Sequence, residues 1–421
     1  MTQRRFGSWY FGWNIVAAAT VITLLTVGMR MSIGPFFIPL AEDLGLSRTL
    51  LAGIIAIGML AYGIGMPMAG QLAQSYGSRF VLVLGTLLVA VAIVWSVLAR
   101  GAFSFFLAFG VLLSLGFSFT SPVALTPVIS RWFTRQRGMA LFFLSTGSMA
   151  GIAIMTPVLT YAIGQVGWRA TLIGFGAAFV LLVAPIALLV IRDDAPPGTD
   201  LLPGSAPAST APETAGLTCR EAMQTCPFWQ IAFGLFACGF SMNLLGTHGV
   251  PMLTDHGFDP VTAAFGIGLI GLVAIPSTVF LGRLSDRLPR KNLLAAIYLI
   301  RGLGFFGLLL VARSWELYAV AAVGGVVWAG SIALSSAILA DVYGVRIVGV
   351  LYGWTYLGHQ IGAMISSWLG GWGYEALGSH WPAFGGAGVV LLLASLVSFQ
   401  LPRRSRPLPA PTTRRAPQPA S

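Results

Sequence analysis

Twelve long apolar stretches constrain the fold of this chain more than any other feature of its sequence. A membrane-spanning helix needs roughly 20 apolar residues, and each stretch is long enough to cross a bilayer. The stretches are continuously apolar and lack the alternation that a transmembrane β-barrel requires. The sequence therefore predicts an all-α membrane protein with transmembrane helices at about 11–36, 49–72, 80–99, 103–130, 138–163, 169–191, 226–254, 261–282, 292–312, 317–340, 349–372 and 383–401.

Composition excludes other classes of protein. Only 9% of the 421 residues are charged, whereas a soluble domain carries about 25%. Mean hydropathy is +0.84. The three cysteines (Cys219, Cys226 and Cys238) lie within 20 residues of one another and have no CxxC spacing. These features exclude a soluble enzyme, a disordered chain and a secreted domain held by disulfides.

The basic residues are divided unequally between the two sides of the membrane. If the N-terminus is cytoplasmic, 18 of the 24 lysines and arginines fall on the cytoplasmic side and four on the outer side, while Arg30 and Arg301 lie inside spans. This asymmetry follows the positive-inside rule and predicts that both termini are cytoplasmic. The same asymmetry accounts for the net charge of +11. The bilayer is therefore the expected partner of the basic residues, and no nucleic-acid partner is expected.

The spans fall into two halves. Residues 192–225 are rich in Pro, Ala, Ser and Thr without apolar periodicity, and they are interpreted as a flexible cytoplasmic linker. We therefore expect one six-helix bundle in residues 1–191 and a second in residues 226–402. The basic, proline-rich residues 403–421 are expected to form a disordered cytoplasmic tail.

A repeated motif relates the two halves. GQLAQSYGSRFVL (70–82) follows the second span and GRLSDRLPRKNLL (282–294) follows the eighth. The second copy resembles the cytoplasmic loop signature of the major facilitator superfamily, with Pro289 in place of a glycine. The resemblance implies twelve helices in two pseudo-symmetric six-helix bundles that work by alternating access. It also implies a gating loop that includes Gly282, Asp286, Arg287 and Arg290.

Further segments are similar to bacterial members of the monocarboxylate porter family. They are YFGWNIV (10–16), RWFTRQRGMALFFLSTGSMAG (131–151), THGVPMLTDHGF (247–258) and GHQIGAMISSWLGGW (358–372). This resemblance implies a transporter of small organic acid anions, often coupled to protons, in a bacterial inner membrane. Two positions depart from it. Ile275 stands where the eighth span of the family carries an arginine, and Met31 stands where animal members carry a lysine.

Ionisable residues inside the spans are the candidate site. No Asp or Glu lies deep in a span, which argues against an organic cation or a hard metal ion as substrate. A charged side chain at the middle of the bilayer costs on the order of 2.5–3.5 kcal/mol on insertion scales. An ionisable residue inside a span is therefore a candidate functional residue. Arg30 either contacts a substrate anion, or reaches the outer headgroups or bonds backbone carbonyls at a helix break near Gly28 and Gly34. Arg301 either binds an anion or bonds neighbouring carbonyls as a structural residue.

Two histidines are candidates for proton coupling, because histidine titrates near physiological pH. His248 shares its helix with Asn243, which we expect to contact substrate; the alternative is a neutral histidine buried within the bundle. His359 follows Tyr356 by three residues, and this polar stripe either faces a cavity or joins helices. The spacing of the four histidines suggests no metal site.

The sequence therefore favours a secondary active transporter, and not an enzyme. Its substrate is expected to be a small organic anion with a carboxylate as the charged group. We expect it to be moved together with a proton by a monomer that needs no cofactor. Expected substrate-binding residues are Arg30, Asn243, His248, Arg301, Tyr356 and His359, with His248 and His359 also coupling protons. The alternatives are an exporter of hydrophobic or amphipathic compounds and a membrane receptor or scaffold that does not transport.

Overall fold

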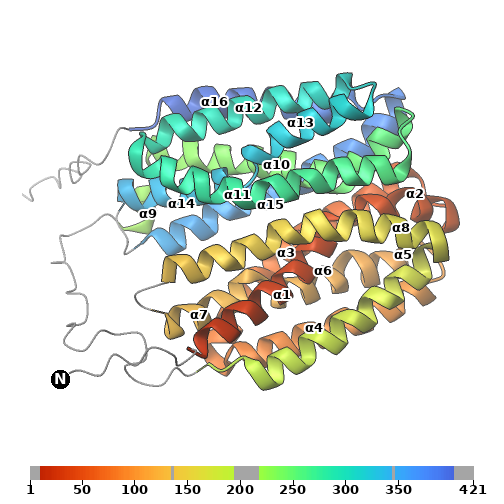
Figure 1. The fold of residues 1–421 in the computed structure, drawn as a ribbon, viewed down its shortest axis with the longest axis horizontal. Helices are drawn as coiled ribbons and strands as arrows, with labels where there is room; N and C mark the ends of the chain where they lie inside the picture. Colours follow the sequence, from red (N-terminus) through yellow and green to blue (C-terminus); the bar gives the residue numbers. More distant parts are fainter. Residues whose placement is uncertain (1–9, 134–136, 194–217, 344–346, 403–421) are drawn as a thin grey trace, which may run out of the picture.

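The computed structural model describes residues 10–133, 137–193, 218–343 and 347–402, and this part of the chain is almost entirely helical (Figure 1). The first half contains α1 (Gly12–Met31), α2 (Gly34–Asp43), α3 (Arg48–Tyr76), α4 (Ser78–Leu98), α5 (Ala102–Phe105), the π-helix η1 (Phe106–Leu112), α6 (Leu113–Phe119), α7 (Pro122–Trp132), α8 (Arg137–Pro185) and the π-helix η2 (Ile186–Val190). The second half contains α9 (Cys219–Met223), α10 (Cys226–Asp255), α11 (Pro260–Arg287), α12 (Arg290–Leu310), α13 (Ser314–Val326), α14 (Gly330–Tyr343), α15 (Val348–Leu377) and α16 (Trp381–Phe399).

These helices form twelve membrane-crossing segments within the described residues. Ten helical runs are long and apolar enough to cross a bilayer. One of them, Met139–Val190, has 52 residues and would be about 78 Å long if straight, so it crosses twice. The helical run turns at Gly167, between the predicted fifth and sixth spans. The φ of Gly167 is 77°, a value that glycine adopts readily because it has no Cβ. α15 supplies the remaining crossing with 30 residues, which include several buried polar side chains.

Three of the predicted spans are broken within the described residues. The first span is interrupted at Ser32 and Ile33, between α1 and α2, and a proline in the first turn of α2 follows the break. The fourth is interrupted between α6 and α7, where Pro122 begins the new helix. Proline suits the first turn of a helix because it has no N–H to pair there. The tenth is interrupted between α13 and α14.

Two hydrophobic cores lie side by side. One is built mainly from residues of α1 to η2, and the other mainly from residues of α9 to α16. Glycines let helices approach closely within each group. A Cβ on Gly28 of α1 would lie 2.8 Å from the backbone of Gly151 in α8, and a Cβ on Gly239 of α10 would overlap the carbonyl of His359 in α15.

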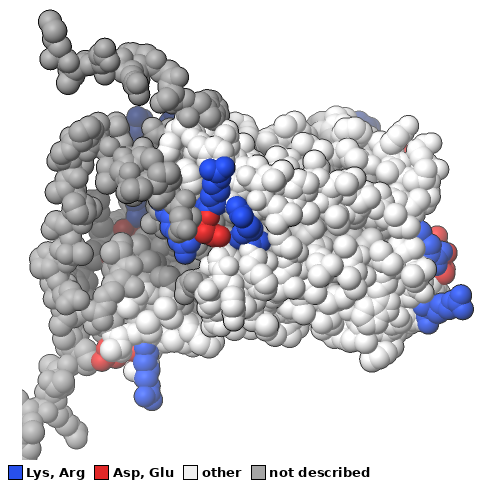
Figure 2. All heavy atoms as spheres, turned by 90° about the horizontal axis from the view of Figure 1, so that it is seen from below, with Lys and Arg blue, Asp and Glu red and all other residues white. Residues whose placement is uncertain are grey.

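The two ends of the molecule differ from the surface between them. Figure 1 shows the start of α1 and the end of α16 at the same end, which we call the terminal end; the other is the opposite end. On the face drawn in Figure 2, charged residues gather toward the two ends and a broad uncharged belt separates them. Such a belt is what a helical protein presents to the hydrocarbon of a bilayer.

The predicted linker is partly helical. α9 lies inside it, and a capping box begins the helix: the Thr218 N–H and hydroxyl donate to the Glu221 carboxylate at 2.8 and 2.9 Å. These bonds hold the pKa of Glu221 below its usual value because they favour the ionised carboxylate. The rest of the linker (194–217) and the predicted tail (403–421) lie outside the described residues.

Candidate functional site between the two halves

Arg30 joins the two halves in the interior of the molecule. It lies in the last turn of α1, just before the break at Ser32, and only 6% of its surface is exposed. Its Nη2 donates to Asn243 Oδ1 of α10 and to Gln360 Oε1 of α15, both at 3.1 Å. A guanidinium of the first half therefore binds two amide oxygens of the second half.

The remaining surroundings of Arg30 belong to α3. Its Nη2 lies 3.1 Å from the Met59 sulfur, and the guanidinium lies over the Tyr62 ring with 4.1 Å to the centroid. Among the described residues Arg30 pairs with no carboxylate, and its Nε has no hydrogen-bond partner. A small cavity of about 20 Å³ borders it, which is room for about one water. The positive charge is thus offset only by neutral dipoles and a ring face.

His359 and Gln360 carry polar atoms that the protein leaves unpaired. His359 is 2% exposed, and neither of its ring nitrogens has a hydrogen-bond partner. Its ring stacks on Tyr356, with 4.8 Å between centroids. Gln360 Nε2 also lacks a partner. Buried polar groups are normally paired, so these atoms are available to a ligand or an internal water.

His248 is placed apart from Arg30 by its contacts. Its Nε2 lies 2.7 Å from the Ser367 carbonyl of α15, and its ring packs edge-on against Phe37 of α2 at 4.7 Å. A Cβ on Gly370 would overlap the imidazole. His248 is therefore held tightly among three helices, nearer the opposite end of α10 than Asn243.

Arg301 stabilises the break between α13 and α14. It is 2% exposed, and its Nη2 donates to the Val327 carbonyl at 2.6 Å and to the Trp328 carbonyl. Its Nη1 contacts the Cys238 sulfur at 3.4 Å. These carbonyls have lost their helical partners at the break, and an unpaired carbonyl in hydrocarbon costs several kcal/mol. In the described part of the chain, Arg301 shares no hydrogen-bond partner with Arg30.

A second set of contacts joins the halves at the opposite end. Arg48, which begins α3, forms a two-pronged ion pair with Asp255, which ends α10, at 2.5 and 3.1 Å. Asp255 also accepts from His380 Nε2 at 2.9 Å. The Thr49 N–H donates to Glu375 Oε2 of α15 at 2.7 Å. These contacts close the opposite end of the interface.

The sequence reasoning missed this closure. Arg48 is one of the four basic residues on the predicted outer side, and neither it nor His380 was expected to contact another part of the chain. The closure could have been suspected because Arg48 and Asp255 lie at the ends of two spans on the same predicted side of the membrane.

Among the predicted gating-loop residues, Arg290 makes its side-chain contact within the second half. Arg290 Nη1 lies 2.8 and 2.7 Å from the two carboxylate oxygens of Asp341, so it joins the start of α12 to the end of α14. Arg287 ends α11, and a Cβ on Gly282 would meet nothing within 4 Å. The side chain of Asp286 lies outside the described part of the structure.

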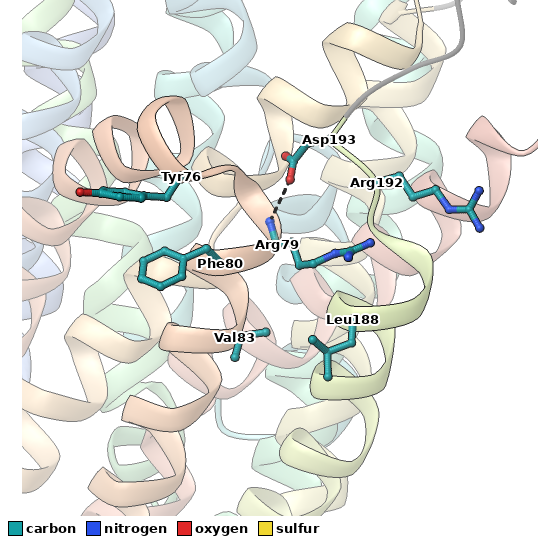
Figure 3. A pocket seen from close by; sticks show the side chains of 7 residues that line it. All are labelled: Tyr76, Arg79, Phe80, Val83, Leu188, Arg192 and Asp193. Atoms are coloured by element: carbon teal, nitrogen blue, oxygen red, sulfur yellow. Dashed lines mark hydrogen bonds between the residues drawn. The ribbon is translucent and has the colours of Figure 1, made fainter.

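In the first-half copy of the loop motif (residues 70–82), the carboxylate comes from Asp193, which lies outside the motif. Asp193, which follows η2, accepts from the Ser78 N–H at 2.8 Å and from the Arg79 N–H at 3.4 Å (Figure 3). A Cβ on Gly77 would lie 2.6 Å from an Asp193 oxygen. Asp193 thus caps the start of α4, a role that the local motif could not reveal because the residue lies 115 positions away.

Metal binding finds no support in this geometry. The described residues contain no group of three or more His, Cys, Asp or Glu side chains that could hold a metal ion.

Comparison with known proteins agrees with this architecture. The model of the Major Facilitator Superfamily matches residues 19–312 and 231–421. An uncharacterized MFS-type transporter of Bacillus subtilis, YcxA, is 26% identical over 85% of this chain and 87% of its own length. Human monocarboxylate transporter 11 is 28% identical over 94% of this chain and 84% of its own length.

A solved structure has the same fold. A bacterial homolog of the human lysosomal transporter Spinster aligns with a TM-score of 0.71 and 16% identity, over 93% of this chain and 97% of its own. The family match spans nearly the whole chain, and the two groups of helices with a polar site between them are the arrangement it predicts. The chain belongs to the major facilitator superfamily of membrane transporters.

Proposed function

We propose that this transporter carries a small organic anion, with a carboxylate as the charged group, and that Arg30 binds it. The observation that carries the proposal is a buried guanidinium whose partners among the described residues are all neutral. A carboxylate satisfies a guanidinium better than amide oxygens do, because the hydrogen bonds are charge-assisted and can be bidentate. The similarity to monocarboxylate transporters supports the same substrate class.

The two amide partners of Arg30 can donate further hydrogen bonds to such an anion. When a carboxylate replaces the amide oxygens at Arg30, the side chain of Gln360 can rotate and donate its Nε2, which has no partner now. Asn243 donates its Nδ2 to the Gly239 carbonyl at 3.0 Å and can change partner in the same way. The anion then bridges Arg30 of the first half and amides of the second. This differential contact would bias an alternating-access equilibrium.

Proton coupling is proposed at His359, with His248 as the second candidate. The ring nitrogens of His359 are unpaired, whereas Nε2 of His248 is engaged by a backbone oxygen. Arg30 and Arg301 oppose an added proton on His359 because like charges repel across a low-dielectric interior. A bound anion offsets that repulsion. Proton and anion would therefore bind together, which is the requirement for symport.

The remaining expectations are consistent with this scheme. By the positive-inside rule the terminal end is cytoplasmic and the opposite end, closed by Arg48 and Asp255, faces outward. We infer a bacterial inner membrane as the location. One chain supplies every residue of the site, so a monomer suffices.

A binding experiment tests the proposal. The purified protein is heated with a panel of monocarboxylates, dicarboxylates, amino acids and cationic drugs at pH 5.5 and 7.5. Stabilisation by carboxylates that increases at pH 5.5 is the expected result, and Arg30→Gln should abolish it. The matched control is Arg283→Gln, an exposed arginine of α11. Stabilisation only by neutral or cationic amphiphiles would refute the anion proposal in favour of an exporter of hydrophobic compounds.

A further inference from the structure

A hollow of about 650 Å³ lies away from the site between the halves. It is formed at the terminal end of the first half, where the start of α4 meets the end of η2 (Figure 3). Phe80, Val83 and Leu188 form its apolar side. Its volume is within the range of small-molecule sites, about 300–1,000 Å³.

Two arginines supply the charge of this hollow. Arg79 donates through Nε and Nη2 to the Ile191 carbonyl at 3.2 and 3.0 Å, and the Arg192 guanidinium lies 4.6 Å from the centroid of the Phe11 ring. Neither forms an ion pair with a carboxylate in the described part of the chain. In Figure 3 the Arg79 side chain extends toward the segment that follows η2, and the Arg192 side chain extends outward from that segment.

Asp193, the carboxylate that lines the hollow in the described part of the chain, already has partners. Asp193 accepts from the backbone N–H groups of Ser78 and Arg79, and its Oδ1 lies 3.8 Å from Arg131 Nη1. Its negative charge is therefore offset locally. Among the described residues, the two arginines give the hollow a net positive charge that favours an anion.

The apolar side of the hollow continues into the lipid-facing surface. Phe80 and Leu188 are 48% and 52% exposed, and two further apolar side chains, Leu87 of α4 and Leu189 of η2, are 59% and 72% exposed. An occupant that pairs with the arginines and also covers this surface must carry an anionic group next to hydrocarbon. Basic pockets at the ends of membrane helices have this preference for acidic lipid headgroups.

We propose that this hollow binds an anionic phospholipid, with its phosphate at Arg79 and Arg192 and an acyl chain along Val83 and Leu188. The headgroup would join the start of α4 to the end of η2 from the lipid side. The inference concerns the first half alone and does not depend on the identity of the transported substrate.

Native mass spectrometry tests this site. The protein is released from nanodiscs that contain equal amounts of phosphatidylglycerol and phosphatidylcholine, and the retained lipid is counted. We expect wild-type protein to retain phosphatidylglycerol preferentially. Each basic residue near an acidic membrane contributes about a fivefold change in lipid affinity, so the double variant R79Q/R192Q should lose about 25-fold. R283Q, which removes an exposed arginine of the second half, should match wild type.

Two further arms keep the result decisive. R192Q alone tests the charge without removing the bonds of Arg79 to Ile191, and it should lose about fivefold. Glycerol phosphate, which has the anionic group without acyl chains, should not raise the melting temperature at millimolar concentration. The proposal fails if the arginine variants retain phosphatidylglycerol as wild type does, if R283Q loses as much, or if glycerol phosphate binds as well as the lipid.

Discussion

Arg48 and Asp255 form an ion pair that connects the first residue of α3 to the last residue of α10, and so connects the two halves of the transporter at the end opposite its termini. A second carboxylate, Glu375, accepts from the backbone beside Arg48. Any opening of the interface at this end must separate these groups. The pair therefore contributes to the closed state only.

Arg48→Gln should raise the population open at the opposite end, because it removes the charge from a contact made only when that end is closed. The reporter is Ala52→Cys, since Ala52 is fully buried beside Gly371 in the closed interface. We expect faster labelling of this cysteine by an impermeant maleimide. Arg169→Gln is the matched control because Arg169 pairs with Asp43 inside the first half. Equal acceleration in both variants would contradict a specific role in closure.

Arg30→Lys should weaken carboxylate binding although it keeps a positive charge. A lysine lacks the planar fork that reaches two acceptors at once, and bonds to charged groups contribute about 1.5–3 kcal/mol, so we expect a Kd about 10- to 100-fold higher. Isothermal titration with the substrate found in the thermal panel measures this. An unchanged Kd would remove Arg30 from the binding site.

Arg301→Gln should reduce stability more than it reduces substrate affinity. The substitution leaves the carbonyls of Val327 and Trp328 without their donor, and each unpaired buried group costs about 1–3 kcal/mol. A lower melting temperature with a Kd within about threefold of wild type is the expected pair of results. A large rise in Kd at unchanged melting temperature would instead make Arg301 a substrate ligand.

His359→Gln should uncouple transport from protons while leaving anion binding in place. A neutral amide can accept and donate hydrogen bonds as a neutral imidazole does, but it takes up no proton between pH 5 and 8. Uptake into proteoliposomes should then lose its dependence on an imposed pH gradient. His248→Gln is the comparison variant, and loss of the pH dependence only in that variant would move the coupling site to α10.

Gly239→Ala should destabilise the second half. The new methyl group would overlap the His359 carbonyl, a backbone atom that cannot move aside, and such overpacking costs about 1–3 kcal/mol. Gly304→Ala in α12 is the matched control because a Cβ there meets nothing within 4 Å. Thermal unfolding should show a lower melting temperature only for Gly239→Ala. Equal melting temperatures would mean that α10 and α15 can separate without cost.

The twelve crossings were predictable from sequence because hydrocarbon admits only backbone that is paired internally, so long apolar runs must be helical. A break near Ser32 was one of the alternatives considered for Arg30, but the break at Val327 was not predictable, because a short interruption leaves the apolar composition of a span unchanged. The prolines at 35 and 122 marked two of the breaks, but proline also occurs inside α3 and α8, where the helix continues.

The sequence by itself determined the protein class, the number of crossings and the short set of buried polar residues worth considering, since each of these depends on composition along one helix. Only the tertiary structure decided how that set divides. Arg30 meets Asn243 and Gln360 across 213 and 330 positions of chain, while Arg301 is turned to the carbonyls of a neighbouring break. Both arginines look alike in sequence because the partners of a buried charge are chosen by helix packing, which brings together groups that are distant along the chain.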